Sequence, residues 1–157
     1  MRLYILLIFL FISQLPLRAQ DMSMEKKLKI IDSLVYFNHL EEASPKIDSL
    51  SKWISGQKQT NSSKNAELQL LYHKAYINAL LFNKSKSLEI ALDLVKKSKQ
   101  YKLPEWEFQA HLAVAGFYEG STDFDKRCKE HLGEAYQLYQ SYQLEHLYSI
   151  YCVRISS

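Results

Sequence analysis

Glycine and proline are scarce in this chain of 157 residues, which contains only 4 glycines and 3 prolines. Average usage is about 7% for glycine and about 5% for proline. A glycine-rich phosphate loop, a dinucleotide-binding turn and a sheet with many tight hairpins all need glycines close together, and the sequence has no such cluster. This shortage excludes those sites and favours helices.

The short motifs of common catalytic and metal sites are also missing. The sequence contains no HExxH, Gly-x-Ser-x-Gly or Cys-x-x-Cys motif. Two pairs of candidate ligands can share a helix face: Glu107 with His111, and Cys128 with His131. A metal site needs three or four ligands that meet in space, and two half-sites do not make one. We therefore predict no catalytic residue, no cofactor and no metal ligand.

The first residues have the features of a targeting segment. A basic start is followed by an unbroken apolar run from Leu3 to Ile12, and a small residue, Ala19, precedes a polar stretch. This order predicts a secretory signal peptide over residues 1–19, cleaved after Ala19. A buried N-terminal helix and an uncleaved anchor are the alternatives, although crossing a membrane takes about 20 apolar residues. We expect an exported protein, located in the periplasm of a Gram-negative bacterium.

The net positive charge falls once this segment is set aside. The whole chain carries 20 basic and 17 acidic residues, a net charge of +3. Without Arg2 and Arg18, the part from Gln20 onwards carries 18 basic residues against the same 17 acidic residues, a net charge of +1. Nucleic-acid-binding domains usually carry a strong basic excess. We therefore expect no nucleic acid partner for this region.

Apolar residues recur at helical spacing from residue 24 onwards, without strand-like alternation. Ser44 and Pro45 resemble a cap followed by a first-turn proline, and Pro104 resembles a second such start. A polar loop is expected over residues 56–64. The predicted helices cover residues 24–38, 45–55, 66–82, 86–101, 104–118 and 122–142, and a seventh begins near Gln143. The fold class that this series predicts is all-α.

Small residues recur at a fixed period within these helices. Ala79 and Ala115 are 36 residues apart in successive first helices, and Ala91 and Cys128 are 37 apart in successive second helices. Small residues are needed where paired helices approach closely, and their recurrence is typical of helical repeat arrays. The chain resembles the tetratricopeptide repeat (TPR) family, whose unit is a helix-turn-helix of about 34 residues.

This resemblance implies a right-handed α-solenoid of about three and a half helix-turn-helix repeats over residues 20–157. The approximate repeats are 24–56, 65–102, 104–142 and a partial repeat 143–157. In this family the first helices line a concave groove that binds a peptide. Carried over to the second repeat, the groove residues are His73, Tyr76, Leu80 and Asn83.

Two features allow more than one interpretation. Cys128 and Cys152, the only cysteines, either form a disulfide in an exported protein or are small core residues, the interpretation that we favour. A lysine-rich stretch over residues 84–102, with a local excess of +4, is a solvated helix face or else contacts an anionic partner or membrane headgroups.

Three function classes follow from these features. The first is an exported, non-catalytic module that binds a protein or peptide in the groove. The second is the sensory N-terminal part of a longer membrane-attached signal-transduction or transcription regulator. The apolar stripe after Gln143 has no polar capping helix, which favours a continuation beyond Ser157, although these residues contain no transmembrane span. The third, a small envelope enzyme, has no converging polar groups to support it.

Overall fold

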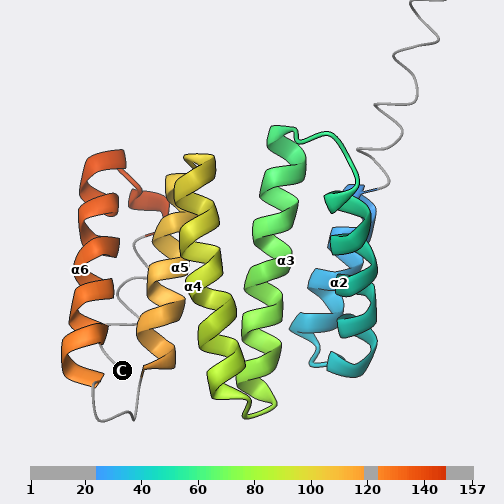
Figure 1. Ribbon diagram of the computed structural model, residues 1–157, viewed down its shortest axis with the longest axis horizontal. Coiled ribbons are helices and arrows are strands. Elements are labelled where there is room, and N and C mark those ends of the chain that lie inside the picture. Colours follow the sequence, from blue (N-terminus) through green and yellow to red (C-terminus); the bar gives the residue numbers. More distant parts are fainter. Residues whose placement is uncertain (1–23, 119–123, 148–157) are drawn as a thin grey trace, which may run out of the picture. The chain divides into compact units, whose positions relative to one another are not determined.

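The computed structural model describes residues 24–118 and 124–147, and all regular structure in these ranges is helical (Figure 1). The prediction of an all-α fold is therefore confirmed for the described residues. A first helix covers residues 24–36. It is followed by α2 (Leu40–Ser55), α3 (Asn61–Leu80), α4 (Lys84–Tyr101), α5 (Pro104–Phe117), α6 (Phe124–Tyr142) and a short 3-10 helix, η1 (Glu145–Leu147).

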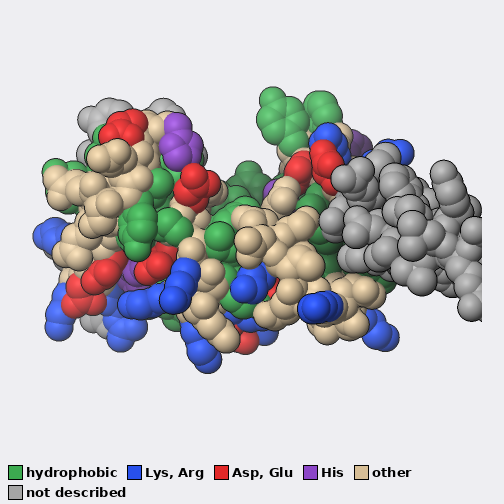
Figure 2. Space-filling view, turned by 90° about the horizontal axis from the view of Figure 1, so that it is seen from above, with side chains coloured by type: hydrophobic (Ala, Val, Ile, Leu, Met, Phe, Trp, Pro, Cys, Tyr) green, Lys and Arg blue, Asp and Glu red, His purple; other side chains and the backbone are tan. Residues whose placement is uncertain are grey.

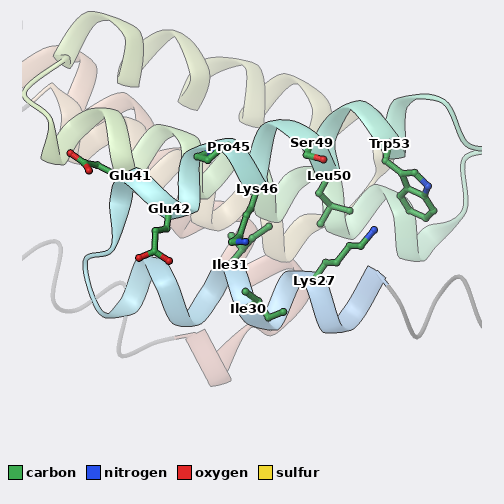
Figure 3. Close-up of a pocket in the computed structure, with 10 residues that line it drawn as sticks. All are labelled: Lys27, Ile30, Ile31, Glu41, Glu42, Pro45, Lys46, Ser49, Leu50 and Trp53. Carbon is green, nitrogen blue, oxygen red and sulfur yellow. The ribbon is translucent and has the colours of Figure 1, made fainter.

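The chain divides into two compact units, one ending at Ser63 and the other beginning at Lys64. In the first unit, the helix over residues 24–36 and α2 are joined by a short turn and lie side by side (Figure 3). Ile31, Ala43, Ile47 and Leu50 are buried apolar residues of these two helices. Their spacing places one apolar face on each helix.

The start of the second helix was predicted incorrectly. α2 begins at Leu40, and Pro45 lies inside it instead of in its first turn. The hydroxyl of Ser44 donates a hydrogen bond to the carbonyl of Leu40 at 3.0 Å, so Ser44 is a helical residue and not the cap. A proline lacks only one backbone donor, and the acidic first turn of α2, Glu41 and Glu42, favours the earlier start.

The loop expected over residues 56–64 is shorter than predicted, because α3 begins at Asn61. Thr60 and Ser63 cap this start reciprocally. The Thr60 amide donates to the Ser63 hydroxyl at 2.8 Å, and the Ser63 amide donates to the Thr60 hydroxyl at 3.1 Å. This is the arrangement of a capping box in which serine takes the place of the usual Glu or Gln.

In the second unit, α5 packs against both α3 and α4. One cluster joins Ala75 of α3, Ala91 of α4 and Val114 of α5, and a second joins Leu68, Leu94 and Ala110 of the same helices. α6 then packs on α5 through Phe108, Leu112 and Ala135. The core of this unit is therefore continuous through α5, which begins at Pro104 as predicted.

A buried contact between α3 and α4 lies one turn from Ala79, the alanine that the repeat pattern singled out. The hydroxyl of the fully buried Ser87 donates to the carbonyl of Ala75 at 2.6 Å. Ala75 is 1% exposed, whereas Ala79 is only half-buried. Small side chains at residues 75, 87 and 91 let the two backbones meet.

Four helices end on a residue in the left-handed conformation, and none of these residues is glycine. They are Asn38 (φ 61°), Phe82 (φ 59°), Lys102 (φ 57°) and Gln143 (φ 53°). After each one, the next amide bonds back to the carbonyl five residues earlier, as in Asn83 to Asn78 at 2.8 Å. This is the Schellman pattern, in which glycine is usual. Glycine is therefore absent even from these helix ends, where it is the most common residue.

The predicted seventh helix differs from the structure over the described residues. After Gln143 ends α6, the described residues form only η1, a 3-10 helix. Leu144 is buried and Leu147 packs against the α5–α6 cluster, so both belong to the core of the second unit. Residues 148–157, with Cys152, and the first two residues of the helix predicted over 122–142 lie outside the described residues, as does the predicted signal peptide.

Candidate functional site

The four predicted groove residues lie along α3 and the turn after it. Tyr76 and Leu80 point outward, with 42% and 39% of their surface exposed. His73 is half-buried, and Asn83, at the start of α4, is exposed. The side-chain amide of Asn83 donates to the side-chain oxygen of Asn78 at 3.4 Å. The spacing of three and four residues places His73, Tyr76 and Leu80 on one face of α3, whereas Asn83 lies beyond the left-handed turn at Phe82.

Phe82, in the turn that follows α3, adds exposed apolar surface two residues after Leu80 and was not among the predicted groove residues. It combines a left-handed backbone with a ring that is 89% exposed. A non-glycine residue in this conformation costs about 1–2 kcal/mol, and no burial of the ring offsets the cost. Leu81 beside it is also exposed. Helical spacing does not show which residues are exposed at a turn. The only sign of this feature in the sequence was that no glycine follows α3, so that another residue had to adopt the left-handed conformation.

A second group of side chains joins α5 to α6. Nδ1 of His111 lies 2.9 Å from Nδ1 of His131, and the two rings are tilted at 42°. The structure thus brings together one residue from each of the two half-sites, Glu107–His111 and Cys128–His131. Among the described residues, however, no group of three His, Cys, Asp or Glu side chains is placed to hold a metal ion.

Burial controls the charge of this pair. Burial lowers the pKa of His111 to about 4, and the nearby charges of His131 and Lys99 act in the same direction. Burial also lowers the pKa of His131, where Arg127 adds to the effect and Glu130 and Glu134 oppose it. Both imidazoles are therefore neutral near pH 7. One ring donates its Nδ1 hydrogen and the other accepts it.

A small polar cavity opens beside His131. It has a volume of about 340 Å³ and is lined by Leu92, Tyr118, Lys126, Arg127, Glu130 and His131. The Arg127 guanidinium donates to the Tyr118 hydroxyl at 3.1 Å and lies over its ring, and the His131 ring stacks on the Tyr118 ring with 6.1 Å between centroids. Tyr118 therefore holds Arg127 in place. The contacts among Arg127, Tyr118 and His131 join α6 to the end of α5, so these side chains already have a role in packing.

The first unit carries a larger groove between the helix over residues 24–36 and α2 (Figure 3). Its volume is about 680 Å³. Buried Ile31 and Leu50 form its floor, and Ile30 stands at its rim with 53% of its surface exposed. Sequence analysis did not identify this groove, because its lining comes from two helices whose packing angle is a tertiary property.

The lysine-rich stretch is partly neutralised within the second unit. Lys86 pairs with Glu89 at 2.9 Å, and Lys97 donates to Glu67 of α3. The Tyr101 hydroxyl donates to the other oxygen of Glu67 at 2.7 Å. Basic and acidic side chains lie interspersed over this unit in Figure 2. Part of the stretch therefore ties α4 to α3, while Lys84, Lys96, Lys99 and Lys102 are exposed.

Comparisons with protein-family models, curated proteins and solved structures found no match. The case for function rests on this chain's own surfaces. No helix within the described ranges is both long and apolar enough to cross a membrane.

Proposed function

We propose that this chain is an exported, non-catalytic interaction module of the tetratricopeptide repeat type, which binds a protein partner over the outward face of α3. The binding residues are His73, Tyr76, Leu80 and Asn83, extended by Phe82. The observation that carries the proposal is the exposed apolar surface of Tyr76, Leu80 and Phe82, which are 42%, 39% and 89% exposed. Exposed apolar surface gathered in one place is typical of protein interaction sites.

The chemistry of the face indicates what the partner presents. Tyr76, Leu80 and Phe82 offer apolar contact area, and aromatic residues dominate the energetics of protein interfaces. Exposed Lys84 follows directly, in a stretch with a basic excess. A partner segment with apolar anchors and flanking acidic residues therefore fits this face best.

The test compares the capture of proteins from an envelope extract by the wild-type chain and by variants. Tyr76→Ala combined with Leu80→Ala, and separately Phe82→Gly, are expected to reduce capture of the same protein at least tenfold. Lys102→Gly is the matched control, because it places glycine at another left-handed helix end, away from this face. Unchanged capture by the double variant and by Phe82→Gly would exclude the face.

Export is tested separately from binding. The signal peptide expected over residues 1–19 predicts a secreted product whose first residue is Gln20. N-terminal sequencing of the protein recovered from the periplasm checks this. A cytoplasmic product that retains Met1 would contradict the proposed location but not the proposed binding face.

A further inference from the structure

The groove of the first unit has an apolar floor and charged ends. Ile31 and Leu50 form the floor, while Ile30 and Trp53 give apolar surface at the rim (Figure 3). Ile30, with 53% of its surface exposed, has more contact with water than a residue in a filled groove would have. Its lining residues all come from two helices joined by one short turn.

The second unit shows how this chain fills a groove between two paired helices. α5 lies against both α3 and α4, and it inserts Ala110, Val114 and Tyr118 between their side chains. A helix is the natural occupant, because the ridges of side chains on one helix fit the grooves between those on its neighbours. The groove between the helix over residues 24–36 and α2 offers a similar seat.

The charges along the groove give it a direction. Glu41 and Glu42 lie at one end, with Lys46 about one turn along α2 from Glu42, and Lys27 and Trp53 lie at the other end (Figure 3). Two carboxylates against one ammonium leave the first end with a net charge of −1, and Lys27 gives the second end a charge of +1. The Lys27 ammonium stands over the Trp53 ring, 5.5 Å from its centroid. A helix carries partial positive charge at its N-terminus and partial negative charge at its C-terminus. A docked helix is therefore most stable with its N-terminus at the acidic end.

The geometry points to a docking site for an amphipathic helix of a partner protein, with its N-terminus beside Glu41 and Glu42 and its C-terminus beside Lys27 and Trp53. Such a helix runs parallel to α2. It presents apolar residues at i, i+3, i+4 and i+7 to Ile30, Ile31 and Leu50. Basic residues in its first turn and acidic residues in its last turn complement the two ends of the groove.

Two labelled peptides test this site on the full chain by fluorescence anisotropy. Each is about 18 residues long, has leucines at helical spacing and carries a covalent i,i+4 staple on its outer face. The staple keeps both peptides helical, because lysines in a first turn and glutamates in a last turn would otherwise weaken the matched helix. The matched peptide has lysines in its first turn and glutamates in its last turn, and the charge-swapped peptide has the same composition with these turns exchanged. We expect the matched peptide to bind with a micromolar dissociation constant and at least ten times more tightly than the charge-swapped one.

Variants locate the binding. Ile30→Glu is expected to raise the dissociation constant of the matched peptide at least tenfold. Tyr36→Glu adds the same charge to an exposed residue of the same helix, outside the groove, and is expected to leave binding unchanged. The Tyr76→Ala, Leu80→Ala double variant is also expected to bind the peptide normally, which separates this site from the α3 face. Circular dichroism of each variant confirms that its helices are retained.

Three results would overturn the proposal. The first is the absence of binding by either peptide up to about 1 mM. The second is equal affinity for the two peptides, which would remove the assigned direction. The third is a dimer in analytical ultracentrifugation that Ile30→Glu converts to a monomer, because the groove would then hold a second copy of this chain.

Discussion

Nδ1 of His111 lies 2.9 Å from Nδ1 of His131, and this contact links α5 to α6. His111 is 7% exposed, and burial, with the charges of His131 and Lys99, lowers its pKa to about 4. A histidine whose folded-state pKa is below its ordinary value of about 6.5 stabilises the fold only while it is neutral.

Acid is therefore expected to destabilise the second unit. The contribution of His111 is complete above about pH 6.5 and is lost as the pH falls towards 4, with a total of about 3 kcal/mol. Urea denaturation at pH 7 and at about pH 4.5 measures this change. Other charges that act on the pair come from α4 and α6, and they are Lys99, Arg127, Glu130 and Glu134.

His111→Phe isolates the histidine from those other charges. It is expected to flatten the fall in stability between about pH 6.5 and about pH 4.5, whatever its effect on stability at neutral pH. Val114→Ala, at a buried apolar residue of α5, removes no titrating group; it is the control and should keep the wild-type pH dependence. Equal pH dependence in the wild type and in His111→Phe would show that the pair does not control acid stability.

Phe82→Gly is expected to stabilise the chain while it weakens partner binding. Glycine adopts a positive φ without steric cost, so the free energy of unfolding should rise by about 1 kcal/mol. Thermal denaturation followed by circular dichroism measures the gain. Lys102→Gly should give a similar gain, since Lys102 has nearly the same φ, 57°. A loss of stability in Phe82→Gly would mean that the ring packs against the fold in solution.

Ser87 is expected to tolerate only small replacements. It is fully buried, and its hydroxyl donates to the Ala75 carbonyl between α3 and α4. Ser87→Ala should cost about 1 kcal/mol through the lost hydrogen bond, and Ser87→Leu should cost about 1–3 kcal/mol more through overpacking. Chemical denaturation ranks the variants. Exposed Ser85→Leu is the control, and equal losses at residues 85 and 87 would contradict the close approach.

Glu67 is expected to couple α3 to α4. Burial raises the pKa of its carboxyl, but the hydrogen bonds from Lys97 and Tyr101 and the charge of Lys97 outweigh this and lower it. Removing the carboxylate in Glu67→Ala should cost about 1–2 kcal/mol. A double-mutant cycle with Lys97→Ala measures the part due to the ion pair. Strictly additive losses would indicate that the pair contributes nothing measurable.

The elements of this fold were predictable where local chemistry alone decides. Pro104 at the start of α5, with Glu105 and Glu107 behind it, fixed a helix start that the structure has at the same residue. At Pro45 the same rule gave a wrong start. Five residues of α2, from Leu40 to Ser44, precede this proline, and two of them, Glu41 and Glu42, are first-turn acids that favour the earlier start. A proline therefore predicts the first residue of a helix correctly only when the residues before it do not themselves favour a helix.

The candidate sites were less predictable, because each depends on tertiary packing. The spacing of Tyr76 and Leu80 shows that they share a face, but only the fold shows that the face points outward. Nothing in the sequence pairs His111 with His131, since their contact depends on how α5 and α6 cross. The groove beside Ile30 depends in the same way on the angle between two helices.

The two tryptophans of the sequence are divided between the units. Trp53 lies beneath the Lys27 ammonium in the first unit, and the Trp106 indole donates to Asn65 at 2.9 Å in the second. Each unit therefore contains its own intrinsic fluorophore. Single-tryptophan chains would report the melting of each half separately, and coincident transitions would mean that the molecule folds as one cooperative body.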